Sequence, residues 1–465
     1  MRVLLASSEI YPYSKTGGLA DFCHSLIKSL REKEGIDAMG ATPLYKSVDI
    51  EKFKIKNTGL SVSVTLDSRE YAFEIFKSKD TYFFYNEKLF GREHIYGPAG
   101  QSYHDNDIRF GGFSWAVAKA VAEGLILADV IHANDWQTAL IPVILKEVFR
   151  SSVKTVFTIH NLAYQGYFDR WMIDRLHLPP HLYNMEALEF WGMVNLLKGG
   201  IIFSDFVTTV SEKYAKEILT QDYGWGLEGV LNKYSFKLRG ILNGIDYDTW
   251  NPKKDRSIWA NYSYSDIQKK FENKKKLCEI FNLDFEKPLI SFISRLSYQK
   301  GVTLILESIR ELSSFGANFF FLGSGEYAEH FRGISGIYEN IISITDFDDA
   351  LSRRLFASSD FILMPSIFEP CGITQMIAMR YGCVPIVRKV GGLEETVKDI
   401  SEGGWGIVFD NPSKGEMLCA IKRAIDLFYN KKKFLATIRE CMRLDFSSDS
   451  MAKKYLQIYR ELTGL

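Results

Sequence analysis

Phe361-Ile362-Leu363-Met364-Pro365 and, just beyond it, Phe368-Glu369-Pro370-Cys371-Gly372-Ile373-Thr374-Gln375 form the stretch that decides the fold. The apolar run closed by proline predicts a buried strand, and residues 376–381 favour a helix. Glu369 is therefore predicted on a strand-to-helix turn. Amide groups at a helix start are unsatisfied and attract a diphosphate, while a carboxylate accepts hydrogen bonds from sugar hydroxyls. This turn is suited to both halves of a nucleotide sugar.

Similar short apolar runs recur along the chain and alternate with segments of helical length. This alternation predicts an α/β fold with parallel strands joined by crossover helices. The expected strands cover residues 3–6, 130–132, 155–159, 206–210, 289–293, 318–322, 361–364 and 384–387. Residues 62–81 predict antiparallel hairpins instead. We expect an N-terminal Rossmann-like domain over residues 1–242, a linker over 243–255 and a second Rossmann-like domain over 256–446.

Composition narrows the class of protein. The 465 residues include 57 basic and 57 acidic side chains, a balance that argues against nucleic-acid binding. The six cysteines show no Cys-x-x-Cys spacing, so neither a disulfide framework nor a zinc site is expected. No run approaches the roughly 20 apolar residues of a membrane helix, and no signal peptide is evident. We expect a cytoplasmic enzyme, or a mature plastid protein, with no membrane partner.

Four further segments lie in the same order as the motifs of one known family. They cover residues 15–21, 132–138, 157–161 and 294–301, and the turn described above adds Glu-Pro-Cys-Gly-Ile-Thr-Gln. The chain thus resembles the glycogen and starch synthases. The resemblance implies the GT-B architecture, with a deep cleft between two Rossmann-like domains and a C-terminal helix, residues 447–465, packed back on the first domain. It also implies retaining transfer of glucose from ADP-glucose to the non-reducing end of an α-1,4-glucan.

Two groups of residues are predicted to bind the diphosphate. Gly17 and Gly18 follow the first strand, so that backbone amides can approach phosphate beside the mobile cation of Lys15, although an ordinary flexible turn would look the same. Arg295 and Lys300 follow the first strand of the second domain, where cations would stabilise charge growing on the leaving phosphate. The alternative is that both are solvated surface cations.

The resemblance implies further residues around the sugar and the acceptor. His160 would lie beside the donor glucose, although an isolated histidine is more often a satisfied core residue. Phe347 would stack on the nucleotide base, or else belong to the core. The predicted catalytic residues are Lys15, His160, Arg295, Lys300 and Glu369. The predicted substrate-binding residues are Glu9, Gly17, Gly18, Asp21, Asp135, Asn161, Asn243, Phe347, Cys371, Gly372, Ile373 and Thr374.

Several alternatives remain open from the sequence. A glucosyltransferase of the same fold that uses UDP-glucose or another acceptor would share these motifs, as would a catalytically silent glucan-binding paralogue. A glycosidase is disfavoured because it needs no phosphate-directed glycines and cations. We expect neither a metal nor a cofactor, since Arg295 and Lys300 supply the positive charge. Asn134 stands where many members of the family have histidine, so acceptor preference is open.

Overall fold

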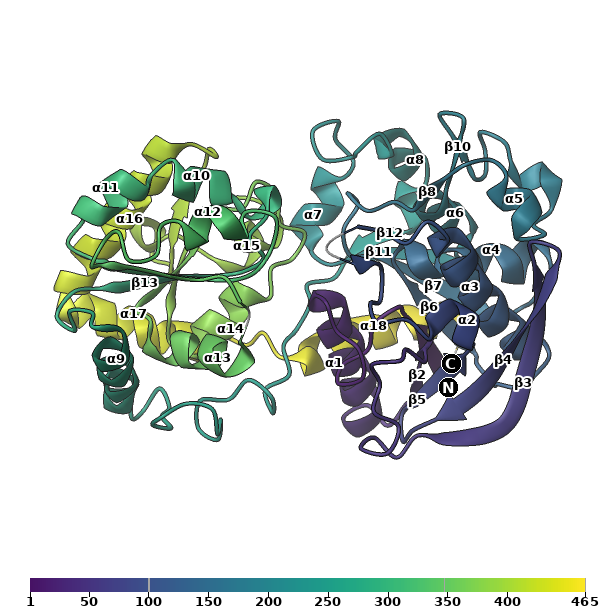
Figure 1. Ribbon diagram of the computed structural model, residues 1–465, viewed down its shortest axis with the longest axis horizontal. Helices are drawn as coiled ribbons and strands as arrows, with labels where there is room; N and C mark the ends of the chain where they lie inside the picture. The colour runs from purple at the N-terminus through teal and green to yellow at the C-terminus, as the bar shows by residue number, and fades with distance from the viewer. Residues whose placement is uncertain (99–100, 347, 465) are drawn as a thin grey trace. The chain divides into compact units, whose positions relative to one another are not determined.

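The computed structural model describes residues 1–98, 101–346 and 348–464. The chain divides into two compact units (Figure 1). Unit 1 comprises Met1–Gly244 and Ser448–Leu465, and unit 2 comprises Ile245–Ser447. Within the described ranges, none of the helices is both long and apolar enough to cross a bilayer.

Unit 1 is built on a nine-stranded sheet in the order β12-β11-β7-β6-β1-β2-β5-β4-β3. The strands from β12 to β5 pair in parallel, whereas β3 and β4 pair antiparallel at one edge. The strands are β1 Arg2–Ala6, β2 Asp37–Pro43, β3 Lys56–Leu66, β4 Arg69–Lys77, β5 Thr81–Tyr85, β6 Val130–Asn134, β7 Lys154–Ile159, β11 Phe206–Thr209 and β12 Leu238–Gly240. The predicted hairpin residues therefore extend the main sheet.

Helices cover this sheet. They are α1 Gly18–Glu32, α2 Glu87–Phe90, α3 Asn106–Ala122, α4 Leu140–Glu147, α5 Met172–Arg175, α6 Leu196–Phe203, α7 Glu212–Glu217, α8 Glu228–Lys233 and α18 Ser448–Thr463. A small antiparallel sheet, absent from the sequence-based expectations, lies at the periphery of the unit (Figure 1). It has the order β8-β10-β9 and comprises β8 Tyr167–Phe168, β9 Glu189–Phe190 and β10 Met193–Asn195.

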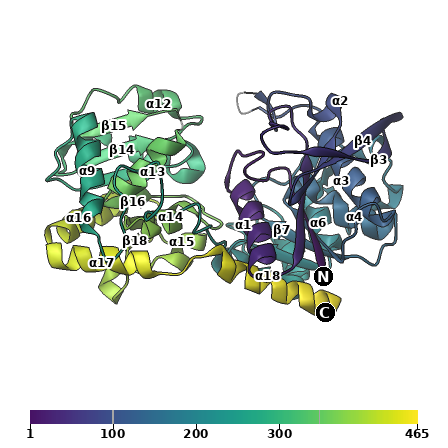
Figure 2. The ribbon, with the colours of Figure 1, turned by 90° about the horizontal axis from the view of Figure 1, so that it is seen from below.

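The C-terminal helix α18 packs beside α1 in unit 1 (Figure 2). Its buried face carries Met451, Tyr455, Ile458 and Tyr459, which join the core under β1 with Phe22 of α1. The tyrosine spacing places both rings on one helical face, as the amphipathic pattern predicts. The helix observed, Ser448–Thr463, lies within the predicted 447–465 segment.

Unit 2 contains a six-stranded, wholly parallel sheet in the order β15-β14-β13-β16-β17-β18. Its strands are β13 Leu289–Ile293, β14 Asn318–Leu322, β15 Ile341–Ile344, β16 Phe361–Met364, β17 Val384–Arg388 and β18 Ile407–Phe409. Its helices are α9 Gln268–Phe281, α10 Val302–Leu306, α11 Ile309–Ser314, α12 Ala328–Arg332, α13 Asp349–Ser358, α14 Thr374–Arg380, α15 Gly391–Thr396, α16 Lys414–Tyr429 and α17 Lys431–Arg443. The strand order reverses at β13 and β16, where ligands of such sheets bind.

The boundary between the units differs from the predicted linker. Most of residues 243–255 belong to unit 2, because the unit begins at Ile245. Asp255 is buried. Its carboxylate accepts a hydrogen bond of 2.5 Å from the Tyr381 hydroxyl and forms an ion pair of 3.2 Å with Arg353. The Arg353 guanidinium also lies 4.1 Å from the Trp250 ring. The segment was predicted as a linker, whereas these side-chain contacts anchor it to unit 2.

Candidate active site

Three strand ends place the predicted residues of unit 1 at one edge of the sheet. Glu9 follows β1, Asp135 follows β6 and His160 follows β7, and these strands are adjacent and parallel. The carboxyl ends of parallel strands meet at the same edge. The side chains therefore belong to one polar cluster, whose contacts with each other the sequence did not specify.

Glu9 fastens the loop that carries Lys15. Its buried carboxylate accepts hydrogen bonds from the amide of Thr16, from the Thr16 hydroxyl at 2.6 Å and from the amide of Gly17 at 3.3 Å. The Tyr96 hydroxyl donates to the same carboxylate at 2.5 Å. Glu9 was predicted to contact glucose or the acceptor. In the structure its oxygens are engaged by the protein, so that its direct effect is to shape the loop.

The Lys15 loop leads into α1 through Gly17. Lys15 pairs with Asp21 at 2.8 Å, and burial raises the pKa of Asp21 although the neighbouring ammonium opposes that rise. A Cβ built on Gly17 meets no heavy atom within 4 Å. The amide of Gly17 is turned towards Glu9, whereas α1 begins at Gly18 with no side-chain cap. The first turn of α1 is therefore the part of this loop whose amides remain available to an anion.

His160 and Asp135 meet across the ends of β6 and β7. The Asp135 carboxylate accepts a hydrogen bond of 2.7 Å from the His160 amide. The His160 Nε2 lies 2.9 Å from the amide oxygen of Asn134, whose amide nitrogen donates to the carbonyl of Ala6. Nε2 must therefore donate to that oxygen. The Phe22 ring packs edge-on against the imidazole with centroids 4.6 Å apart.

Burial sets the charge of these groups. Desolvation lowers the pKa of His160 to about 3 and raises the pKa of Asp135 to about 7. Amides of His160 and Asn161 moderate the rise for Asp135. At neutral pH the imidazole is uncharged, so it acts as a hydrogen-bonding group and not as a cation. Asp135 also holds an unusual backbone, with a φ of 56°, which aims its carboxylate at the following strand end.

Two predicted asparagines have different surroundings. Asn161 accepts a hydrogen bond of 3.1 Å from the amide of Ala163, which makes it part of the turn after β7. Asn243 is buried, and its side-chain oxygen has no hydrogen-bond partner in the part of the chain that the structure describes. A buried acceptor without a donor is costly. Among the predicted residues that the structure describes, Asn243 therefore has an acceptor that the surrounding protein leaves unsatisfied.

Unit 2 brings Lys300 and Glu369 together. Lys300 lies in a short 3-10 helix, Tyr298–Lys300, after β13, and Glu369 lies in the loop after β16. Their ion pair measures 2.6 Å, and the side chains are 16% and 5% exposed. The Ser366 hydroxyl donates to the same carboxylate oxygen at 3.0 Å. The Arg295 side chain is exposed and forms no ion pair or hydrogen bond with the described residues, while its backbone carbonyl accepts from the amide of Ser297 at 3.0 Å.

The turn after Glu369 is shaped by glycines. Gly372 has a φ of +71°, where a side chain would be strained. A Cβ on Gly392, at the start of α15, would lie 1.9 Å from the carbonyl oxygen of Cys371. Gln375 donates to that same oxygen at 3.1 Å. The predicted residues Cys371, Gly372, Ile373 and Thr374 thus form a tight turn into α14, which starts at Thr374.

Some site residues escaped prediction because their roles depend on distant partners. Tyr96 lies in a loop far from Glu9 in sequence, and no local signal indicates their contact. Arg388, buried at the end of β17, donates from Nε to the carbonyl of Ser366 at 2.7 Å and thereby supports the Glu369 loop. An arginine at a strand end was the only available signal for it. The predicted base-stacking residue Phe347 lies outside the described residues.

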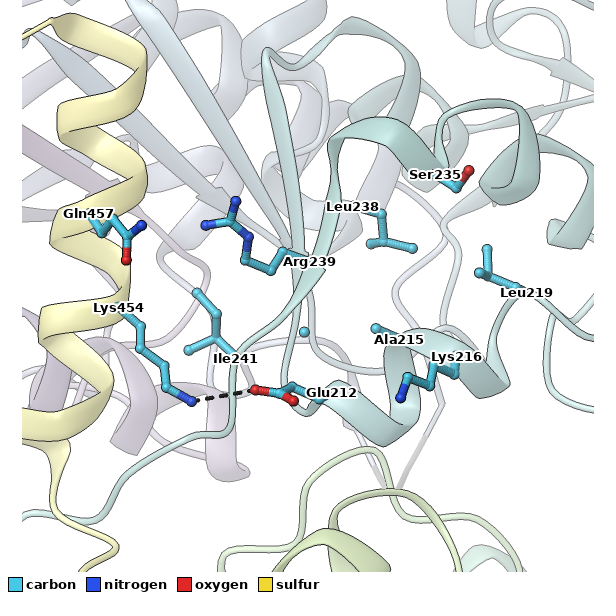
Figure 3. Close-up of a pocket in the computed structure, with 11 residues that line it drawn as sticks. Glu212, Ala215, Lys216, Leu219, Ser235, Leu238, Arg239, Ile241, Lys454 and Gln457 are labelled. Atoms are coloured by element: carbon cyan, nitrogen blue, oxygen red, sulfur yellow. Dashed lines mark ion pairs between the residues drawn. The ribbon is translucent and has the colours of Figure 1, made fainter.

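A cavity of about 490 Å³ lies elsewhere in unit 1, between β12, α7 and α18 (Figure 3). Lys216, Arg239 and Lys454 line it, and Lys454 pairs with Glu212 at 3.6 Å. None of the predicted site residues that the structure describes lines this cavity.

Two protein-family models match this chain. Residues 2–233 match the starch synthase catalytic domain family, and residues 273–440 match the glycosyl transferases group 1 family. Glycogen synthase of Aquifex aeolicus is 59% identical over 462 residues, which cover 99% of each chain. The chain belongs to the glycogen and starch synthase family. Glycogen synthase of Thermodesulfovibrio yellowstonii is 41% identical over 100% of this chain and 98% of its own.

Solved structures extend the similarity to the fold. The catalytic domain of starch synthase IV from Arabidopsis thaliana, bound to ADP and acarbose, superposes with a TM-score of 0.93 at 32% identity over 100% of this chain and 99% of that one. Sucrose-phosphate synthase from Thermosynechococcus elongatus, at 16% identity and a TM-score of 0.64, shares the fold. This family member is a glycosyltransferase with the GT-B fold and glycogen or starch synthase function.

Proposed function

We propose that this synthase transfers glucose from ADP-glucose to the non-reducing end of an α-1,4-glucan, with retention of the anomeric configuration. The observation that carries the proposal is the Lys300–Glu369 ion pair, which joins the loops after β13 and β16, together with the exposed Arg295 in the loop after β13. This is where parallel sheets bind ligands. The structural neighbour bound to ADP and acarbose supports an adenine nucleotide and a glucan analogue as the ligand classes.

The charge distribution of unit 2 fits the diphosphate. In the described part of this loop, the Arg295 guanidinium is exposed and forms no ion pair with the protein. Its positive charge is therefore available to phosphate oxygens. Lys300 supplies a second positive charge that the Glu369 carboxylate holds in place at 2.6 Å. As the glucosyl bond breaks, negative charge grows on the leaving phosphate, and fixed cations stabilise that state more than the ground state.

Unit 1 supplies a different set of groups. Burial keeps the His160 imidazole uncharged, and its Nε2–H donates a hydrogen bond to the Asn134 side-chain oxygen, which leaves Nδ1 as an acceptor. We assign it to a sugar hydroxyl. The unpartnered oxygen of Asn243 accepts from a second hydroxyl. We assign Glu369 to sugar hydroxyls and not to a covalent intermediate; Lys300 and Ser366 fix one of its oxygens, which leaves the other to accept from a hydroxyl.

Donor choice is the part of this proposal that most needs an experiment. Labelled ADP-glucose and UDP-glucose are each offered with glycogen and with maltose, and chain elongation is scored. Preferential incorporation from ADP-glucose is expected. Equal or faster incorporation from UDP-glucose overturns the donor assignment and favours the alternative donor, whose recognition depends on few contacts with the base.

We also propose that transfer needs no metal ion or cofactor, because Arg295 and Lys300 supply the positive charge at the phosphate. Full activity after dialysis against EDTA is expected, and a loss that Mg²⁺ restores contradicts this assignment. A reducing compartment such as the cytoplasm is proposed on the six free cysteines, of which Cys23, Cys278, Cys371, Cys383 and Cys441 are buried.

A further inference from the structure

The cavity of unit 1 between β12, α7 and α18, named the basic cavity here, is lined by three cations from three elements (Figure 3). Lys216 belongs to α7, Arg239 to β12 and Lys454 to α18. Glu212 is the carboxylate that lines it. Three positive charges against one negative charge favour an anionic ligand. These cations lie outside the sequence motifs and outside the candidate active site.

The protein leaves the donors of these cations available. Lys454 lies 3.6 Å from Glu212 and Arg239 lies 3.5 Å from Glu461, and all four side chains are between 43% and 62% exposed. Charge-assisted hydrogen bonds are shorter, at about 2.7–2.9 Å. The exposed Lys216 ammonium forms neither an ion pair nor a hydrogen bond within the part of the chain that the structure describes. A ligand can therefore compete for all three groups, because exposed ion pairs are weak.

The cations occupy two ends of the basic cavity, as Figure 3 shows. Arg239 and Lys454 lie beside α18, whereas Lys216 lies at the other end, on α7. Glu212 lies between the two ends and forms its ion pair with Lys454 there. Negative charge on a ligand is therefore favoured at both ends of the cavity and disfavoured in its middle.

Apolar side chains form much of the remaining lining. They are Ala215, Leu219, Leu238 and Ile241. Gly240 lets β12 approach α7 closely, because a Cβ there would lie 2.2 Å from the carbonyl oxygen of Ser211. The volume of about 490 Å³ suits a small organic molecule and exceeds the space that a bare ion needs. The lining therefore favours a ligand whose body is uncharged and contacts hydrocarbon.

We propose that the basic cavity binds a small organic ligand with two phosphate monoester groups, one at each end of an uncharged body. One phosphate contacts Arg239 and Lys454, and the other contacts Lys216. A phosphate monoester carries more negative charge than a carboxylate and offers a third acceptor oxygen, so it satisfies more of these donors. The Arg239 guanidinium, 5.2 Å from the centroid of the Phe206 ring, presents a fork of N–H groups that matches two phosphate oxygens.

The test measures the binding of 1,6-hexanediol bisphosphate by calorimetry, with ADP present to occupy the transfer site. Hexyl phosphate is the comparison ligand. The bisphosphate should bind about tenfold more tightly than hexyl phosphate, because it contacts both ends of the cavity. Lys216→Gln should remove this advantage, and Arg239→Gln combined with Lys454→Gln should weaken both ligands about tenfold. The three side chains are exposed, so the thermal midpoint should not change.

Lys33→Gln is the matched control, because Lys33 is also exposed and forms no ion pair with the described residues, but does not line the basic cavity. Its affinities for both ligands should equal those of the parent. Equal affinity of the parent for the bisphosphate and for hexyl phosphate overturns the proposal, as does an unchanged bisphosphate affinity of Lys216→Gln. Weakened binding in Arg295→Gln also overturns it, because the signal then comes from the transfer site.

Discussion

Removing the ammonium of Lys300 should affect stability and activity to measurable and separable extents. Lys300→Ala leaves the Glu369 carboxylate, which is 5% exposed, with the Ser366 hydroxyl as its remaining side-chain donor among the described residues. Breaking a buried ion pair from one side costs about 3 kcal/mol, taken at the low end because Lys300 is still 16% exposed. For a unit of this size that loss lowers the thermal midpoint by about 9 °C.

Activity should fall for a second reason. Loss of one cation at the leaving phosphate is expected to reduce kcat about 100-fold to 1,000-fold, as for removal of one donor from an oxyanion site. The double variant Lys300→Met with Glu369→Gln removes both charges, so most of the stability should return. Its activity should stay low, because neither replacement stabilises the phosphate charge.

Calorimetry and initial rates with ADP-glucose and glycogen measure the two effects on the same preparations. Lys276→Ala is the matched control, since its ion pair with Glu279 is about half exposed on both sides and should contribute less than about 0.5 kcal/mol. Near-normal turnover of Lys300→Ala would refute the diphosphate role. Recovery of activity together with stability in the double variant would show that the pair acts only in folding.

Three further outcomes follow from the structure. Burial lowers the pKa of His132 to about 3, so on acidification the unfolded chain binds a proton that the folded chain does not, and the free energy of unfolding falls. Between about pH 7.5 and pH 5, urea titrations should show that the parent loses about 2 kcal/mol more of this free energy than His132→Gln. Equal losses in the two proteins would contradict this burial effect. Gly392→Ala places a Cβ 1.9 Å from the Cys371 carbonyl oxygen and should lower the free energy of unfolding by about 2 kcal/mol, seen as a lower thermal midpoint. Gly17→Ala places its Cβ in open space and should leave the thermal midpoint unchanged. Truncation before Ser448 uncovers the core face of α1 and should abolish cooperative unfolding of unit 1, while a chain that still melts sharply would show that α18 is dispensable.

Local patterns specified much of the fold. The expected strands over residues 289–293, 318–322 and 361–364 coincide with β13, β14 and β16. They could be predicted because a strand buried on both faces of a parallel sheet is a short continuous apolar run. The amphipathic spacing near the C-terminus likewise indicated a helix. β2 and the small sheet were missed, since Asp37–Pro43 and the two-residue strands lack such a run.

The sequence alone determined that this chain alternates strands and helices, ends its strands in polar turns and carries the motifs of a glycogen or starch synthase. Tertiary structure decided which polar groups meet: Lys300 with Glu369, separated by 69 positions, and Glu9 with Tyr96, separated by 87. It also decided that the Glu9 carboxylate accepts hydrogen bonds from its own loop. Hydrophobic periodicity is a property of a short segment, whereas hydrogen-bond partners at strand ends depend on the order in which strands associate, and that order is set by packing of the whole unit.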